Sequence, residues 1–241
     1  EQQIILLSDY GIDNLIFPSQ PSISKGENAE DVPFYFNENY YAEDDFYAHK
    51  LITTEFLGKM RGQQLARISV APFQYNPVTN QLKVVTKLEV KIIFKNIDFE
   101  GHKINKQKYY SPEFNNLFKE CINYLPPKEK DVITTYPVKY VIIADPAFQT
   151  ALQPLVQWKT KKGFMVVEGY TNDPLVGNTD VSIHAYLQNM YDNATAADPA
   201  PTYLLIVGDN AEVPSFNTGQ HVSDMYFCEF DGGGDFYPEM Y

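Results

Sequence analysis

Three short apolar runs in the second half of the chain constrain its fold more than any other feature. The runs are KYVIIAD (139–145), FMVVEGY (164–170) and TYLLIVGD (202–209). The segments between them, 146–162 and 180–193, carry apolar residues at helical spacing. Strands that alternate with helices form parallel sheets through right-handed crossovers, so residues 138–241 are predicted to form an α/β domain with a parallel sheet. Asp145 and Asp209 lie at strand carboxyl ends, where ligands and catalytic groups gather in such sheets.

The first half of the chain has the pattern of a β-rich domain. Short runs rich in Val, Ile, Phe and Thr are separated by turn residues. They are IILLS (4–8), NLIF (14–17), LITTEFLG (51–58), QLARISVAPFQ (64–74), QLKVVT (81–86) and LEVKIIF (88–94). The segment 75–80 predicts a hairpin turn, because Pro77 presets φ. Evenly spaced short strands predict a sandwich or barrel-like β domain, and we assign a sandwich-like domain to residues 1–105.

Residues 106–137 separate these two parts and are mostly polar. An apolar patch from Phe114 to Leu125 follows one helical face, with Ser111 as the start signal and Pro126 as the stop. The charged residues 128–131 after it are predicted to form an exposed linker. The predicted division is therefore 1–105, 106–137 and 138–241.

Charge and composition exclude several classes of function. The 241 residues hold 31 acidic and 19 basic side chains, a net charge of −12, which disfavours nucleic acid or an anionic membrane as partner. No apolar run approaches the ~18 residues of a membrane span. Two cysteines are too few for a disulfide framework. The start EQQIILLSDYG has no basic region of a signal peptide, so in a secreted protein the signal would lie upstream of Glu1.

The segment DGGGDFYPE (231–239) is a candidate metal site. Asp235, Tyr237 and Glu239 alternate at i, i+2 and i+4, which can direct two carboxylates and a backbone carbonyl at one hard cation. Oxygen ligands without His or Cys favour Ca²⁺ over zinc. The alternative is an acidic hairpin turn with solvated charges.

Nucleophilic and zinc motifs are absent from the sequence. The histidines fall in no HExxH pattern, and no serine lies in a GxSxG context. His184 lies within an amphipathic segment, which favours a structural role. His221 and Cys228 are seven residues apart and form a conceivable nucleophile pair, but closeness in sequence does not establish closeness in the fold.

Several blocks of the sequence resemble the precursors of gingipain-type cysteine peptidases. The propeptide-like blocks include Met60-Arg61-Gly62, the segment VAPFQYNPV (70–78) and the segment SKGEN (24–28). The blocks that are similar to the opening of the catalytic domain include YVIIA (140–144), YLLIVGD (203–209) and DFYPE (235–239). The blocks follow one another in the same order over most of the chain.

This resemblance implies a secreted or cell-surface cysteine endopeptidase zymogen that acts on proteins or peptides. The first part would be a propeptide that packs on its own peptidase domain and keeps it latent. The second would be the start of a caspase-like α/β domain. The family's catalytic Cys and His are expected after residue 241, and His221 and Cys228 do not match them, so no residue here is assigned a catalytic role.

The resemblance also implies three kinds of site. The family's calcium ligands would be Asp209, Asp235, the Tyr237 carbonyl, Glu239 and a loop carbonyl such as that of Gly232 or Gly233, of which Gly233 is assigned. Lys25 matches a basic residue that fills the peptidase's specificity pocket in related propeptides, and the alternative is a solvated surface lysine. Lys128 or Lys130 would be the site of maturation cleavage.

Two other interpretations of the sequence stay open. The chain could be a non-catalytic relative that serves as a cell-surface binding or secretion-accessory module. Residues 138–241 could instead form a receiver-like or flavodoxin-like domain, although the acidic pair and the phosphate or flavin loop of those folds are missing.

Overall fold

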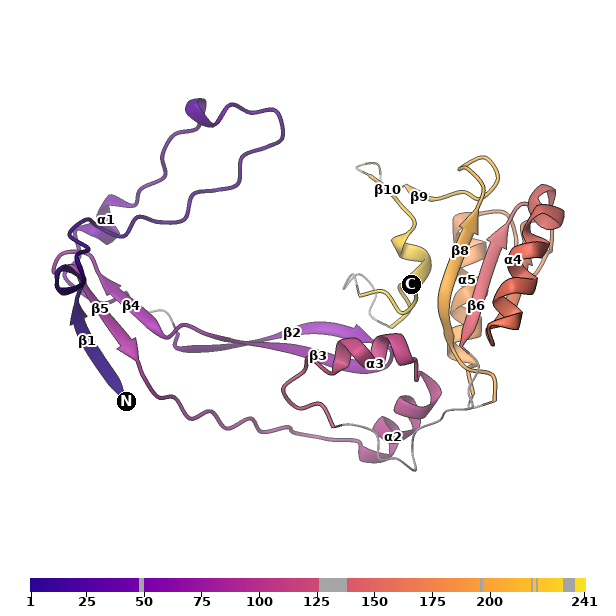
Figure 1. Cartoon of the computed structure of the whole chain (residues 1–241), viewed down its shortest axis with the longest axis horizontal. Helices are drawn as coiled ribbons and strands as arrows, with labels where there is room; N and C mark the ends of the chain where they lie inside the picture. The colour runs from indigo at the N-terminus through magenta and orange to yellow at the C-terminus, as the bar shows by residue number, and fades with distance from the viewer. Residues whose placement is uncertain (48–49, 126–137, 196, 218, 220, 232–236) are drawn as a thin grey trace. The chain divides into compact units, whose positions relative to one another are not determined.

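The structure is a computed structural model of the chain (Figure 1). It describes residues 1–47, 50–125, 138–195, 197–217, 219, 221–231 and 237–241. The chain divides into two compact units that are interleaved in sequence. The first holds Glu1–Glu55 and Arg67–Lys95, and the second holds Phe56–Ala66 and Asn96–Tyr241. The predicted division at 105 and 138 stays a prediction.

A parallel three-stranded sheet forms the centre of the second unit, as predicted. Its strands are β6 (Lys139–Ala144), β7 (Met165–Tyr170) and β8 (Pro201–Val207). Their order is β7-β6-β8, and both pairs are parallel. Val141 lies opposite Val167 on one side and Leu204 on the other.

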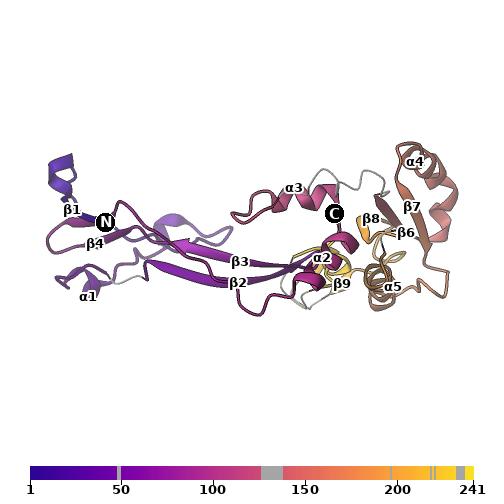
Figure 2. The same ribbon diagram turned by 90° about the horizontal axis from the view of Figure 1, so that it is seen from below.

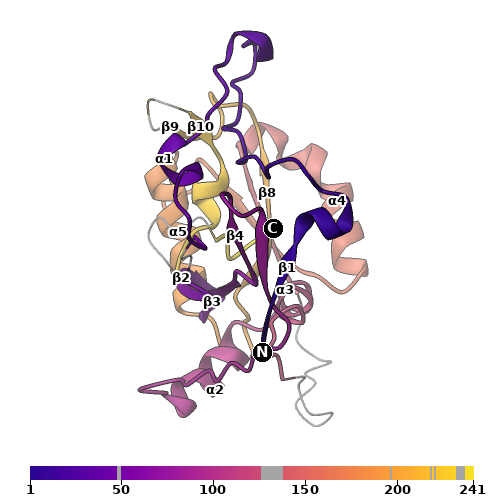
Figure 3. The ribbon, with the colours of Figure 1, turned by 90° about the vertical axis from the view of Figure 1, so that its left-hand side faces the viewer.

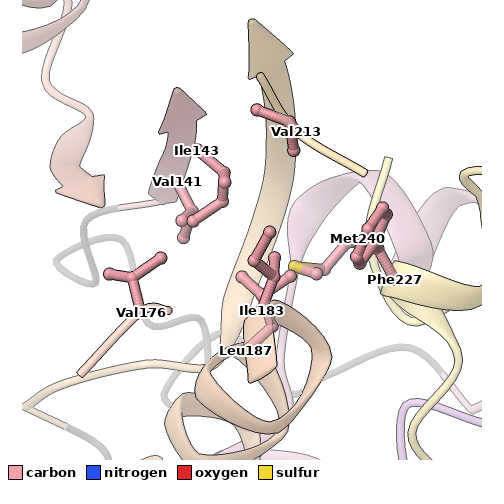
Figure 4. Packing of buried hydrophobic residues seen from close by; sticks show 8 residues of the cluster. All are labelled: Val141, Ile143, Val176, Ile183, Leu187, Val213, Phe227 and Met240. Carbon is pink, nitrogen blue, oxygen red and sulfur yellow. The ribbon is translucent and has the colours of Figure 1, made fainter. Parts of the chain in front are cut away.

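Two helices cover opposite faces of this sheet (Figures 1 and 2). Val141 and Ile143 of β6 pack on Ile183 and Leu187 of helix α5 (Asp180–Asp192), as Figure 4 shows. The intervening residues Ile142 and Ala144 pack on Leu152 of helix α4 (Gln149–Lys161). Because successive strand residues point to opposite faces, a strand covered on both faces must be apolar throughout, which explains the runs in the sequence.

Local signals set the ends of these helices. The Thr179 side chain accepts a hydrogen bond from the backbone N–H of Ser182, and the Ser182 hydroxyl accepts one from Thr179 N, which forms a capping box at the start of α5. Asp145, at the end of β6, accepts a hydrogen bond from Ala147 N at 2.8 Å. It therefore caps the short helix η4 (Pro146–Phe148) that leads into α4.

The first unit contains an antiparallel sheet. Its strands are β1 (Gln2–Leu6), β5 (Gln81–Val85) and β4 (Phe73–Asn76), in the order β1-β5-β4. The predicted turn between β4 and β5 is confirmed. The Asn76 side chain accepts hydrogen bonds from Val78 N and Thr79 N at 3.0 and 3.2 Å.

Two predicted strands of this unit are wrong. Residues 14–17 and 88–94 form no strand, and Ile93 and Phe94 are 66% and 60% exposed. An apolar run becomes a strand only where another strand offers it hydrogen bonds, and the three-stranded sheet of the described residues ends at β1 and β4. A two-sheet sandwich is therefore not confirmed.

Strands β2 (Ile52–Met60) and β3 (Gln63–Val70) form a separate two-stranded hairpin. Its tip, Phe56–Ala66, belongs to the second unit. The two residues between the strands, Arg61 and Gly62, both have positive φ, at 51° and 69°. Two such residues are the signature of a type I′ turn, which suits the twist of a hairpin.

The second unit also holds two short helices before the sheet. They are α2 (Phe99–Lys108) and α3 (Pro112–Phe118). Helix α3 is shorter than predicted, because Ile122 and Leu125 are 82% and 76% exposed and have no surface to pack on. Helix α2 has no apolar face and was not predicted. The predicted linker around Lys128 and Lys130 lies outside the described residues.

The remaining short elements complete the description. They are η1 (Leu7–Tyr10), η2 (Ala29–Asp31), α1 (Glu38–Tyr41), β9 (Phe216–Asn217), β10 (Val222–Ser223) and η5 (Met225–Cys228). In the described part of the chain, no helix is long and apolar enough to cross a membrane.

Candidate functional site

Asp209 lies just beyond the end of β8, at the edge of the parallel sheet. Its side chain is exposed, and its Oδ1 accepts a hydrogen bond from Asn210 N at 2.7 Å. Its own backbone N–H donates to Glu212 Oε2 at 2.9 Å. Gly208 has φ of 143°, a backbone conformation that favours glycine. A Cβ at this position would also lie only 2.8 Å from the Glu212 side chain.

Glu239 lies in the C-terminal segment, which pairs in parallel with the start of β8. Leu204 N donates to Tyr241 O at 2.7 Å, and Tyr241 N donates to Thr202 O at 2.8 Å. Glu239 is fully buried, and its Oε2 accepts a hydrogen bond from Phe230 N at 2.6 Å. Its backbone N–H donates to Cys228 O at 2.7 Å.

The predicted calcium ligands are only partly within the described residues. Gly233 and Asp235 lie outside them. In the described ranges, no group of three or more Asp, Glu, His or Cys side chains is placed to hold a metal ion. Asp209, Tyr237 and Glu239 carry oxygen donors of the kind that Ca²⁺ prefers. Asp209 follows the end of β8, however, whereas Glu239 lies near Pro201 at its start, so the structure does not bring these two carboxylates together. The calcium set therefore stays a prediction.

Cys228 lies in an environment that disfavours its reactive form. Burial raises the pKa of the Cys228 thiol to about 12, and the nearby carboxylates of Glu239 and Asp224 add to the effect. His221, the other member of the conceivable pair, is exposed, and its ring stacks on Tyr226 with centroids 6.4 Å apart. A thiol that stays protonated at neutral pH is a poor nucleophile.

His184 is in contact with the protein interior. Its Nε2 lies 3.1 Å from Glu229 O, and its ring packs near Phe216 and Phe230, with centroids 6.0 and 5.6 Å away. These contacts fit the structural role that the sequence favours.

Lys25 lies in a tight turn within the first unit. Glu27 N donates to Ser24 O at 3.0 Å, and Ser24 N donates to Glu27 Oε2 at the same distance. Gly26 has φ of 103°, as the third residue of a type II turn requires. Lys25 is therefore presented on an exposed turn between two hydrogen-bonded residues.

The loop that carries Lys25 is closed at its base by one side chain. The Gln20 amide donates to Tyr35 O at 3.1 Å and accepts from Tyr35 N at 2.7 Å. Stacked aromatic rings lie beside this clamp, among them Phe36 and Tyr41 with centroids 4.2 Å apart. Figure 3 shows the loop projecting beyond α1.

Arg61 occupies a buried site that the sequence patterns did not indicate. The side chain is 1% exposed, and its guanidinium donates hydrogen bonds to four backbone carbonyls. The acceptors are Tyr109 O at 2.9 Å, Glu239 O at 2.9 Å, Tyr110 O at 3.5 Å and Pro201 O. The rings of Phe114 and Tyr191 lie 5.2 and 5.7 Å from the guanidinium carbon.

Acidic side chains complete the surroundings of this arginine. Asp231 Oδ2 accepts hydrogen bonds from Gly62 N and, at 2.8 Å, from the Tyr191 hydroxyl. Burial lowers the pKa of Arg61, and the charges of Glu239 and Asp231 oppose that shift. Burial also raises the pKa of Tyr191, so its hydroxyl stays a donor.

One signal in the sequence could have identified this site. A two-residue type I′ turn favours Asn, Asp or Gly at its first position, because φ is positive there. Arg61 is none of these, and an unusual residue at a strained position suggests that its side chain makes contacts that offset the strain.

Comparison with known families identifies the two parts of the chain. The model of the C25 propeptide matches residues 8–109, and the model of peptidase family C25 matches residues 133–241. Lys-gingipain of Porphyromonas gingivalis is 36% identical over 249 residues, which cover 100% of this chain and 14% of that protein. Gingipain R2 of the same organism is 27% identical, over 95% of this chain and 31% of that protein.

A solved structure of gingipain K from Porphyromonas gingivalis, titled for its zymogenic latency, is also similar. It is 43% identical over 35% of this chain and 46% of that chain, with a TM-score of 0.32, which is too low to support an inference about the fold. The chain spans less than a third of either curated relative. It belongs to the gingipain-type cysteine peptidase precursors of family C25 and joins their propeptide to the start of their peptidase domain.

The buried arginine links these two parts. Arg61 and Tyr109 fall in the propeptide match, whereas Pro201 and Glu239 fall in the peptidase match. All of them lie in the second compact unit.

The raised pKa of Cys228 leads to a prediction about its chemical reactivity. At pH 8 a thiol with a pKa of about 12 has roughly a thousandfold less thiolate than an unperturbed cysteine. In the folded chain, iodoacetamide should therefore label Cys121 well before Cys228, as read by mass spectrometry of peptides. Both cysteines should react at similar rates in urea, and equal labelling without urea would contradict the prediction.

Proposed function

We propose that this chain comes from the precursor of a secreted or cell-surface cysteine endopeptidase. The proposal rests on the two family matches, which follow one another in the order of propeptide and peptidase. The catalytic Cys and His lie outside residues 1–241, on a peptidase domain with a caspase-like α/β fold. Proteins or peptides are the substrates. The raised pKa of Cys228 supports the absence of the nucleophile from this segment.

The propeptide, with a sandwich-like β domain, keeps the peptidase latent. Cleavage after Lys128 or Lys130 then separates the two parts of the chain. A charged segment between the two family matches is the kind of place where maturation proteases cut.

Activation of the full-length precursor tests this proposal. The intact precursor should hydrolyse denatured casein slowly, and the cleaved form should do so rapidly and lose activity on alkylation of thiols. Edman sequencing should find that the mature chain begins at Glu129 or Asp131. As a control, Cys228→Ser should keep its activity within about threefold, since a buried protonated thiol takes no part in the reaction.

Two results would contradict this proposal. One is a mature chain that begins far from residues 129–131, which would exclude the cleavage site. The other is the absence of thiol-dependent hydrolysis after cleavage, which would favour the non-catalytic surface module.

We also propose that Lys25 fills the primary specificity pocket of the peptidase. The turn of Ser24 to Glu27 supports this role, because it leaves the lysine exposed. A lysine stem can pack on apolar walls while its ammonium reaches a carboxylate at the floor of the pocket.

Replacement of Lys25 should weaken latency. Loss of one charge-assisted contact costs about 1.5–3 kcal/mol, so Lys25→Ala should raise the activity of the uncleaved precursor roughly ten- to a hundredfold. The matched control is Lys87→Ala, whose side chain is 73% exposed and should be neutral. Unchanged activity of the uncleaved Lys25→Ala precursor would show that Lys25 is a surface lysine only.

We further propose that Asp209, Asp235, Glu239 and the carbonyls of Tyr237 and Gly233 bind Ca²⁺. Bound calcium would offset the repulsion between three carboxylates and join the end of β8 to the acidic loop. The exposed carboxylate of Asp209 supports one member of this set. Glu239 lies near Pro201 at the opposite end of β8, so binding would require the two carboxylates to approach one another.

Calcium should then stabilise the folded chain. At a concentration a hundred times its Kd, an ion that binds only the folded state adds about 2.7 kcal/mol, which is several degrees in Tm. Asp235→Asn should remove most of this gain, whereas Asp9→Asn, an exposed acidic residue of the first unit, should keep it. Equal Tm values in calcium and in chelator would exclude the site.

A further inference from the structure

The tip of the β2–β3 hairpin, Phe56–Ala66, falls in the propeptide match. It nevertheless belongs to the same compact unit as the peptidase match. We propose that Arg61 is the anchor that keeps the propeptide bound to the peptidase domain after the linker between them is cut. This inference rests on the proposed function, in which the two parts are separated by cleavage.

The backbone conformation at the tip indicates that arginine is favoured here by the contacts of its side chain. Arg61 has φ of 51°, a left-handed conformation that L-residues other than glycine adopt at a cost. Asn or Gly would fit this turn with less strain, but neither could reach the carbonyls that Arg61 contacts. The hydrogen bonds of the guanidinium therefore offset the backbone strain at Arg61.

The hydrogen bonds of the guanidinium join the two parts of the precursor. Its donors reach Tyr109 O and Tyr110 O next to helix α2, and Pro201 O and Glu239 O on and beside β8. A buried charge needs such partners, because desolvation would otherwise make its burial unfavourable. Removal of the hairpin would leave the two carbonyls of the peptidase segment without these bonds.

The surroundings of Gly62 make the same connection. Gly62 N donates to Asp231 of the peptidase match, and a Cβ at Gly62 would lie 2.8 Å from the Tyr109 ring. Tyr109 in turn stacks on Tyr191 of α5, with ring centroids 4.4 Å apart. The tip is thus held by a backbone hydrogen bond as well as by the arginine, and Gly62 has no room for a side chain.

This arrangement has a consequence for maturation. Cleavage of the linker breaks one covalent connection, but the Arg61 side chain is 1% exposed and must be withdrawn before the propeptide can leave. Interactions that are buried and hydrogen-bonded act mainly on the dissociation rate. The anchor therefore sets the lifetime of the cleaved, still associated complex.

The experiment measures release of the propeptide from the cut chain. A recognition site for a specific protease is inserted between Pro127 and Lys128, and the 241-residue chain is immobilised through its C-terminus. After the cut, the N-terminal part should leave at least ~30 times faster from Arg61→Ala than from the parent. Arg61→Lys should be intermediate, because an ammonium cannot reach all four carbonyls.

A second arginine on the same hairpin provides the matched control. Arg67 pairs with Glu55 at 2.5 Å, but its side chain is 61% exposed, so Arg67→Ala should release the propeptide within about twofold of the parent rate. Circular dichroism checks that each variant folds. If Arg61→Ala does not fold, Arg61→Lys alone decides the question.

Three outcomes would overturn the inference. They are release from Arg61→Ala within about threefold of the parent, release from Arg61→Lys at the parent rate, and immediate release from the parent itself. The assay reads no peptidase activity, so a negative result here leaves the proposed function intact. Failure of the activation experiment would contradict the proposed function, and it would be measured independently of the release rate.

Discussion

The buried charge of Arg61 is the constraint on which the second unit depends. A guanidinium that loses its water must find several acceptors in one plane, and here they come from three separate stretches of backbone. Those stretches are the end of α2, the start of β8 and the segment around Glu239. This requirement explains why the second unit includes the hairpin tip Phe56–Ala66, which lies far from the sheet in sequence.

The parallel sheet was the part most open to sequence reasoning. Strand β6 is covered by helices on both faces, so every residue from Val141 to Ala144 is buried and apolar, and a short run of this kind is typical of a central parallel strand. The helices beside it were equally clear, because α4 and α5 each have one face to bury. The strand order β7-β6-β8 was not predicted, but it agrees with right-handed crossovers whose helices lie on opposite faces of the sheet.

The errors in the first half have a common physical cause. Apolar residues at 88–94 have strand-like composition, but a strand needs a hydrogen-bonded neighbour, and composition does not say whether one is present. Helix α2 shows the reverse case, because it forms although it has no apolar face. Its N-terminus is capped by Asp98, whose Oδ1 accepts a hydrogen bond from Gly101 N at 2.9 Å. The two-residue turn marks Arg61 as unusual, but the acceptors of its hydrogen bonds lie up to 178 positions away and are not contained in any local pattern.

The Gln20 clamp separates the Lys25 loop from the architecture that carries it. Its two hydrogen bonds to Tyr35 close the loop at its base, so the sheet does not depend on the residues between them, of which Phe34 alone joins the aromatic cluster. The entropy of closing a loop grows only slowly with its length, and exposed loops accept changes more readily than cores. Residues 21–33 can therefore change in length and sequence during evolution at little cost to folding. A new inhibitory sequence could arise on an unchanged scaffold, alongside changes in the enzyme that it restrains.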